Sequence, residues 1–251
     1  YHGYGVTSGS YYPWYKYREW IVEVYVDNNV TKLGWGCFSG LKNMRKITIP
    51  FFGMYAKPEL IGEPCASVGA IFECARNDES SYSSGLSFKL EKNLKEIVYT
   101  SGIINCKTAL EIKSYNSDPS NYFSTTSYYE MPSIDNITFT FKGLKEISSY
   151  SDFPKELISV PVNLDYMGES IPAGALAYLT GLRSLKLKGT GAPNGSTTFA
   201  LNSLFVKYQQ AGTTLVDGYY IPSNLEEVVI KEGTATIPNA AFKNLAMIKK
   251  I

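Results

Sequence analysis

The feature that most constrains this sequence is a short apolar spacing that recurs along the chain. It is clearest in the segment LGWGCFSGLKNMRKITIP, where intervals of three are followed by one interval of two: Phe38, Leu41, Met44, Ile47 and Ile49. A period of three is too short for one face of an α-helix, and a step of two is the period of a strand. Pro50 follows at once, and proline cannot donate to a strand ladder. The segment therefore predicts a return limb that leads into a very short strand.

The same frame returns in IPAGALAYLTGLRSLKL and in IPNAAFKNLAMIKKI. A small residue precedes the leading Phe or Leu each time, at Cys37, Ala175 and Ala241. A second form keeps only the strand end, in KNLKEIVY, SIDNITF, PKELISVPV and PSNLEEVVI. The step from Val24 to Ile47 is 23 residues, and so is the step from Val228 to Ile251. Self-similarity with a period of about 20–29 residues is the signature of a leucine-rich repeat solenoid.

We therefore predict a leucine-rich repeat solenoid, α/β and mainly β, with one parallel sheet of very short strands and helical insertions between repeats. One repeat cannot bury its own apolar face, so neighbouring repeats must stack. The predicted strands are Val24–Val26, Ile47–Ile49, Ile97–Tyr99, Ile137–Phe139, Leu185–Leu187 and Val228–Ile230. The residues that we expect to be nearly fully buried are Phe38, Leu41, Ile47, Leu176, Leu182, Phe242 and Leu245.

The chain resembles the BspA-like leucine-rich repeat family of bacterial surface proteins. Units of that family end in a small-Phe pair, a short spacer and Leu-x-x-Ile-x-Ile-Pro. The pair matches Cys37-Phe38 and Ala241-Phe242, with Ala175-Leu176 as a variant, and the end matches ITIP at residues 47–50. The resemblance implies a non-enzymatic module on a bacterial surface or outside the cell. It covers about half of the chain, because the rest consists of insertions.

The insertions show a different pattern, in which apolar residues recur at i, i+3, i+4 and i+7. This spacing predicts amphipathic helices in ASVGAIFECA (66–75) and FALNSLFVKY (199–208). We expect one leucine-rich repeat domain over residues 1–251 that ends within a repeat. Its other parts are a Tyr-rich N-terminal cap or arm at 1–19 and insertions at about 51–88, 114–132 and 188–220, of which 114–132 is a loop.

Histidine is nearly absent, since His2 is the single one and lies one residue from the start. Ser-His-Asp and Cys-His catalysis and most catalytic zinc sites need a positioned imidazole. We therefore predict no catalytic residue, no cofactor and no metal site, and a chain that is not an enzyme. The less favoured alternative is a carbohydrate-active enzyme that uses two carboxylates, which need no histidine. The 23 acidic residues allow it, but no pair stands out.

The cysteines are better explained by packing than by chemistry. Cys37 occupies the small position that alanine fills in other repeats, and Cys106 lies in a loosely matching repeat. Cys65 and Cys74 flank one predicted helix, which would hold them about 13 Å apart, so a disulfide there is a minor alternative. The loop GTGAPNG (189–195) is one residue too long for a dinucleotide-binding turn, and we predict a flexible loop.

The predicted strand face supplies the candidate ligand surface. The residue between the two buried positions of each strand must point outward, and stacked strands repeat it about every 4.8 Å. These outward residues are Tyr25, Thr48, Val98, Thr138, Lys186 and Val229. Solenoids use such extended faces for binding. With flanking cations added, the candidate ligand surface is Tyr25, Arg45, Lys46, Thr48, Lys95 and Lys186.

The expected partner is an extracellular protein or glycan. A net charge of +1 gives no footprint for nucleic acid, and no apolar run is long enough to span a membrane. We expect a monomer on the bacterial cell surface or secreted, whose signal or anchor lies outside this sequence. A structural spacer in a larger cell-wall protein, with no ligand of its own, is the alternative function. In that case the charges of the strand face only keep the sheet soluble.

Overall fold

The apolar frame of the sequence folds into short parallel strands that pair in register from repeat to repeat. The computed structural model describes residues 12–34, 36–56, 71–76, 86–104, 136–153, 157–188, 201–208, 215–219, 221–231, 236–239, 241–242 and 245–251. The chain divides into two units, Tyr1–Val98 with Asn105–Ile137 and Tyr99–Ile104 with Thr138–Ile251. The fold of a leucine-rich repeat solenoid with short parallel strands is confirmed.

In the first unit the strands β1 (Glu23–Tyr25), β2 (Lys46–Ile49) and β5 (Glu96–Tyr99) follow one another in this order. The pairing of β1 with β2 is parallel and places Val24 opposite Ile47, which is the 23-residue step seen in the sequence. β5 continues beside β2, because the amides of Lys95 and Glu96 both donate to the carbonyl oxygen of Arg45. As expected, β2 ends immediately before Pro50.

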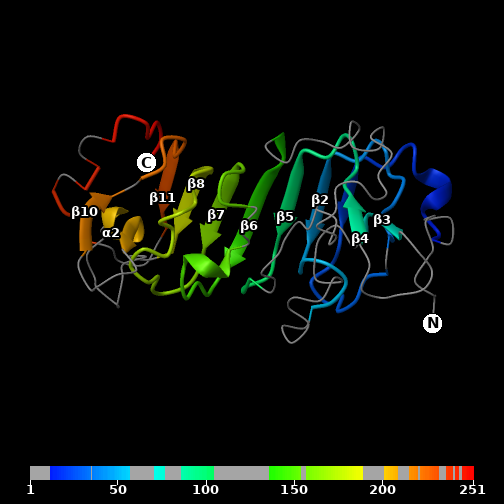
Figure 1. Cartoon of the computed structure of the whole chain (residues 1–251), viewed down its shortest axis with the longest axis horizontal. Helices are drawn as coiled ribbons and strands as arrows, with labels where there is room; N and C mark the ends of the chain where they lie inside the picture. The colour runs from blue at the N-terminus through cyan, green and yellow to red at the C-terminus, as the bar shows by residue number, and fades with distance from the viewer. Residues whose placement is uncertain are drawn as a thin grey trace. The chain divides into compact units, whose positions relative to one another are not determined.

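In the second unit β6 (Thr138–Leu144), β7 (Val162–Tyr166), β8 (Leu182–Leu187) and β11 (Glu227–Ile230) lie side by side in this order (Figure 1). All three pairings are parallel. The last repeat continues the ladder, because Lys250 forms an isolated parallel bridge with Glu227. The second 23-residue step of the sequence is therefore also a step between neighbouring repeats.

The core lies between these strands and the return limbs of the repeats. The alternate strand residues Ile47 and Ile49 in β2 and Leu185 and Leu187 in β8 are completely buried. Five of the residues that the frame predicts as nearly fully buried are so: Phe38, Leu41, Ile47, Leu176 and Leu182.

The prediction of full burial is wrong for Phe242 and Leu245, which are only half-buried. They belong to the repeat at the end of the ladder. Within the described residues this repeat has a neighbouring strand on one side only, at β11. A solenoid repeat buries its apolar face between two neighbours, so a repeat with one neighbour keeps part of that face exposed.

Two strands lie further along the chain than the apolar frame predicts. β6 includes Phe139 but runs on to Leu144, and β7 begins at Val162, where the frame of PKELISVPV expects the strand end. Register places Phe141 opposite Leu164, which in turn faces Leu185. The apolar residues just before these strands have the same spacing as a repeat, so the sequence fits both an earlier and a later strand position. Pairing with the neighbouring strands selects the later one.

Two of the inserted segments contain an antiparallel hairpin where the sequence predicts part of a helix. β3 (Glu73–Arg76) pairs with β4 (Leu86–Lys89), and β9 (Val206–Tyr208) pairs with β10 (Leu215–Tyr219). The helix prediction is therefore wrong over residues 73–75 and 206–208. Within the described residues of the two predicted helices, the short helix α2 (Leu201–Leu204) is the one α-helical segment, and residues 66–70 and 199–200 lie outside the described residues. A single helical turn that leads into a strand gives the same apolar spacing, and hairpin pairing outweighs the helical preference.

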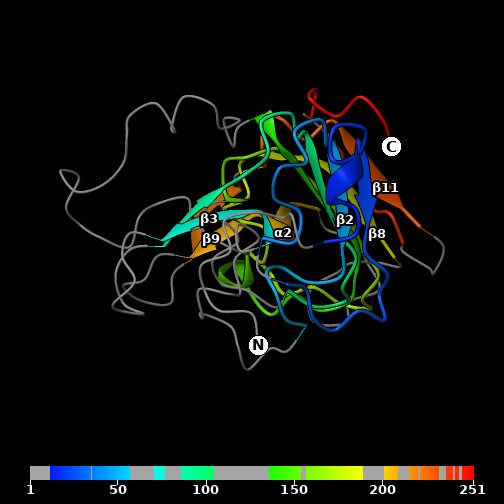
Figure 2. The same ribbon diagram turned by 90° about the vertical axis from the view of Figure 1, so that its right-hand side faces the viewer.

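The insertions join the return limbs through equivalent backbone bonds in the two units. The amide of Phe38 donates to the carbonyl oxygen of Ile71 at 2.9 Å, and the amide of Leu176 donates to that of Leu204 at 2.9 Å. Phe72 and Phe205, the residues that follow, are both fully buried. In the view of Figure 2, α2 lies between β9 and the strand β8. The predicted loop at 114–132, Cys65 and Cys106 lie outside the described residues.

Aromatic residues at positions 12 and 14 pack on the return limb that leads to β2. The ring of Trp14 lies 5.9 Å from that of Phe38 and 5.1 Å from that of Tyr12. The indole Nε1 of Trp14 donates to the carbonyl oxygen of Cys37 at 2.8 Å. These contacts extend the apolar core of the first unit to Tyr12 and Trp14.

Candidate binding surface

The strand face of the first unit holds five of the six candidate residues. Register places Glu23 opposite Lys46 and Tyr25 opposite Thr48. Tyr25 is 69% exposed, whereas Thr48 is half-buried. Val98, predicted to point outward on β5, is only 6% exposed. The sequence pattern predicts on which face of the sheet a side chain lies, but it does not predict what covers that face.

The cations of this face differ in their partners. Lys46 Nζ lies 2.9 Å from a carboxylate oxygen of Glu96, so its charge is neutralised by the neighbouring strand. Arg45 and Lys95 are exposed, and neither side chain forms an ion pair with a described residue. Backbone bonds hold these two residues side by side, because the amide of Lys95 donates to the carbonyl oxygen of Arg45 at 2.8 Å. Among the described residues, Arg45 and Lys95 thus have no ionic partner, whereas Lys46 is paired with Glu96.

The strand face of the second unit carries two polar rows that register defines. One row contains Thr140, Asn163, Ser184 and Glu227, and the next contains Lys142, Asp165, Lys186 and Val229. Asp165 therefore stands opposite Lys186, and Lys142 stands opposite Asp165. Thr138, which the sequence frame assigns to this row, lies earlier on β6. The error follows from the shifted frame of β6 and β7.

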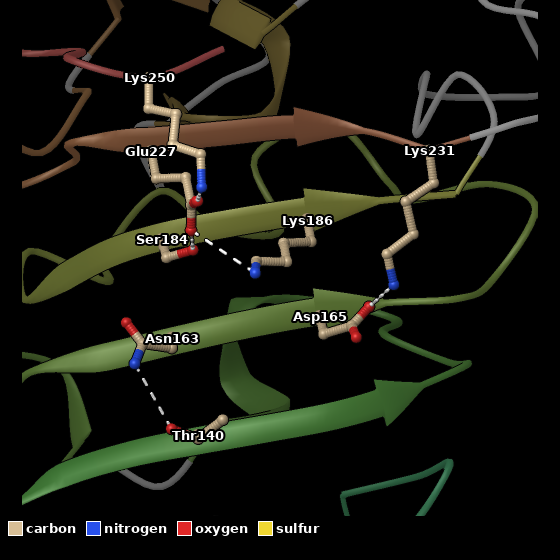
Figure 3. Close-up of polar contacts among 8 residues, drawn as sticks. All are labelled: Thr140, Asn163, Asp165, Ser184, Lys186, Glu227, Lys231 and Lys250. Carbon is tan, nitrogen blue, oxygen red and sulfur yellow. Dashed lines mark hydrogen bonds and ion pairs between the residues drawn. The ribbon is translucent and has the colours of Figure 1, made fainter.

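Glu227 is the centre of a polar network in this unit (Figure 3). Its carboxylate oxygens lie 2.6 Å from Lys250 Nζ, 2.5 Å from the hydroxyl of Ser184 and 3.6 Å from Lys186 Nζ. The hydrogen bond from Lys250, followed by that from Ser184, lowers the pKa of Glu227 to about 2. The candidate residue Lys186 is thus engaged with a carboxylate of its own sheet.

A second ion pair crosses this face. Lys231, which follows β11, reaches Asp165 on β7 with its Nζ 2.5 Å from the carboxylate oxygen. Asn163 donates to the hydroxyl of Thr140 at 3.4 Å on the neighbouring row. Sequence reasoning missed Asp165 and Lys231. A correct alignment of β7 with β8 would have found Asp165, but no signal in the repeat frame indicates Lys231.

The carboxylates of the second face do not form the acid pair that a glycosidase requires. A general acid needs a raised pKa, and that of Glu227 is lowered. Asp165 is held by Lys231. Within the part of the chain that the structure describes, no three His, Cys, Asp or Glu side chains gather as they would around a metal ion.

Cys37 lies in the core of the first unit, as the repeat frame predicts. The thiol is 2% exposed, and burial raises its pKa to about 12. A buried thiol that stays protonated at neutral pH is a poor nucleophile. This position therefore serves packing.

A comparison with models of protein families shows the family to which the chain belongs. The model of the BspA type leucine-rich repeat region matches residues 12–58 and 157–251 in six copies, which together make more than half of the chain. The chain belongs to this family. The BspA-type repeats contain Tyr25, Arg45, Lys46, Thr48 and Lys186, while Lys95 lies between the two matched segments. No curated protein and no solved structure matches the chain.

Membership of the BspA-type family supports a general statement about function. Its repeats are typically non-enzymatic protein-interaction modules and are generally associated with bacterial surfaces. Over the described ranges, no helix has the length and apolar character needed to cross a membrane.

Proposed function

We propose that this chain is a non-enzymatic module, displayed on a bacterial cell surface or secreted, that binds an extracellular protein or glycan through its strand face. The observation that carries this proposal is the exposure of Arg45 and Lys95 just before the start of two neighbouring strands, β2 and β5, and of Tyr25 at the end of β1. An aromatic ring and a guanidinium fork on the same few strands offer stacking and bidentate hydrogen bonds to an extended ligand. A face that served only solubility would have no need of a ring exposed to 69%.

A structural spacer is the second candidate, and the second unit favours it. There the cations Lys186, Lys231 and Lys250 are paired with Asp165 or Glu227. Charges that neutralise one another across neighbouring strands leave little for a ligand and hold the ladder in register. In the spacer account, the exposed cations of the first unit have the same solubilising role as any other surface charge.

An array of extracellular proteins and glycans, incubated with the full chain, separates the two functions. The binding account predicts at least one ligand, whose binding weakens as salt rises. The matched variant carries Tyr25→Ala, Arg45→Ala and Lys95→Ala, and it should keep its melting temperature while losing that ligand. A Lys186→Ala variant should retain the ligand. A wild-type chain that binds nothing on the array favours the spacer, and a triple variant that binds normally moves the site away from this face.

A further inference from the structure

Four exposed cations of the first unit form a block on two successive repeats. Lys42 and Arg45 belong to one repeat, and Lys92 and Lys95 belong to the next. Two bonds set them side by side: the Asn93 side chain donates to the carbonyl oxygen of Lys42 at 2.7 Å, and the Lys95 amide donates to that of Arg45. We call these four residues the basic block. None of the four side chains forms an ion pair with a described residue.

Several other cations of the strand faces do form ion pairs. Lys46, Lys186, Lys249 and Lys250 each lie within ion-pair distance of a carboxylate on a neighbouring repeat, and Lys231 reaches a carboxylate two strands away. Stacked strands bring like charges close together, which is unfavourable unless an anion lies between them. The carboxylates near the block have other partners: Glu19 pairs with Arg18, Glu96 pairs with Lys46, and the buried Glu91 accepts a hydrogen bond from the amide of Gly40. Glu23 is the exposed exception, opposite Lys46.

Exposed apolar side chains lie on the repeat that precedes the block. Trp20 is 80% exposed, and Tyr17, Val22 and Tyr25 are exposed by 47%, 48% and 69%. The amide of Arg45 donates to the carbonyl oxygen of Val22 at 2.8 Å, which places this segment beside the block.

The segment around Trp20 is also anchored to the next repeat. The side chain of Asn43 donates to the carbonyl oxygen of Glu19 at 2.6 Å. Asn43 and Asn93 thus make equivalent bonds, each to the preceding repeat. Trp20 and the basic block therefore belong to one continuous surface of the first unit.

We propose that this surface binds an anionic polysaccharide. Sulfate or carboxylate groups along the polymer would accept hydrogen bonds from Arg45, Lys42, Lys92 and Lys95, and a sugar ring would stack on Trp20. The repeat presents cations in equal steps, which suits a linear polymer with regularly spaced anions. A single-stranded nucleic acid needs successive aromatic platforms, whereas the rings of Tyr17 and Trp20 are tilted by 35° with centroids 6.4 Å apart.

This inference rests on the proposed binding function and goes beyond it by naming the ligand class and the block. The test uses the full chain and four probes: a heparin oligosaccharide, a polygalacturonate oligosaccharide, neutral dextran and a single-stranded DNA. The block variant carries Lys42→Gln, Arg45→Gln, Lys92→Gln and Lys95→Gln. The matched control removes exposed cations of the second unit through Lys142→Gln, Arg183→Gln and Lys188→Gln. Circular dichroism melts establish that both variants fold.

Wild type should bind at least one of the two anionic oligosaccharides and not dextran. The block variant should bind at least about tenfold more weakly at low salt, because it loses its charge-assisted hydrogen bonds. Trp20→Ala should weaken binding without changing its salt dependence, and the control variant should bind like wild type. Equal losses in the control and block variants, or tighter binding of the DNA, would overturn the proposal. If wild type binds neither anionic oligosaccharide, this inference is wrong. The proposed binding function would still be supported if the array shows a ligand.

Discussion

Lys231 and Asp165 form an ion pair across a whole intervening strand, with Nζ 2.5 Å from the carboxylate oxygen, although the two residues are 66 positions apart in sequence. Lys231 follows β11 and Asp165 lies on β7, so the lysine side chain passes over β8 (Figure 3). The contact ties repeats that do not pair directly. Both side chains are partly exposed, at 31% and 24%, which limits the stabilisation.

A double-mutant cycle measures this pair. Lys231→Ala and Asp165→Ala should each destabilise the chain, and the double variant should cost less than their sum. The expected coupling lies between about 0.2 and 1 kcal/mol, as for other partly exposed ion pairs. Urea unfolding at low salt provides the free energies. Costs that add without coupling would show that the contact does not form in solution.

Glu227 should make the stability of the chain depend on pH at the acid end. Its pKa in the folded protein is lowered to about 2 by Lys250 and Ser184. The carboxylate therefore stabilises the fold above the pKa of an unfolded glutamate, about 4.3, and this contribution is lost as pH falls toward 2. Glu227→Gln should flatten the pH dependence of unfolding in this window.

The control for this variant is Glu169→Gln, which replaces an exposed carboxylate that makes no ion pair with a described residue. It should leave the pH dependence unchanged. The same flattening in both variants would contradict the role of Glu227.

Two neighbouring core positions test the repeat frame. Phe38 is 6% exposed and packs against Trp14, so Phe38→Ala should cost about 3–5 kcal/mol. Cys37→Ala should cost far less, because alanine fills the equivalent positions 175 and 241. Thermal melts rank the two variants, and a larger loss for Cys37→Ala would refute the frame.

Gly181 sits where the return limb of one repeat approaches the backbone of its neighbour. A Cβ added there would overlap the carbonyl oxygen of Val160. Gly181→Ala should therefore destabilise the chain by about 1–3 kcal/mol, the usual cost of overpacking. Gly102→Ala is the control, since its Cβ would meet only the flexible side chain of Lys145, at 3.3 Å or more. Equal melting temperatures for the two variants would argue against the close approach at Gly181.

The sequence alone predicts the repeat where one frame fits. Ile47 and Ile49 are placed correctly, because Pro50 ends the strand and fixes its register. β7 is misplaced, because Val160 and Val162 satisfy the same spacing as the true pair Leu164 and Tyr166. The choice between these frames depends on pairing with β8, which is a tertiary interaction.

The candidate site is predictable to the same degree. Tyr25, Arg45 and Lys95 are found because each has a fixed offset from buried strand residues. The partners of Lys46 and Lys186 depend on which residues stand across the ladder, and Lys231 has no place in the frame. Which charges of the face form ion pairs therefore depends on the register between neighbouring repeats, and the sequence of a single repeat does not contain that register.

Chemical footprinting of lysines tests the central claim, that a ligand binds the strand face of the first unit. The full chain is acetylated with and without its array ligand or the heparin oligosaccharide, and labelling is read by mass spectrometry. The account predicts that bound ligand lowers labelling at Lys42, Lys92 and Lys95 and leaves the exposed Lys142, Lys188 and Lys249 unchanged. Protection confined to the lysines of the second unit, with Lys42, Lys92 and Lys95 labelled as in the free chain, would contradict it.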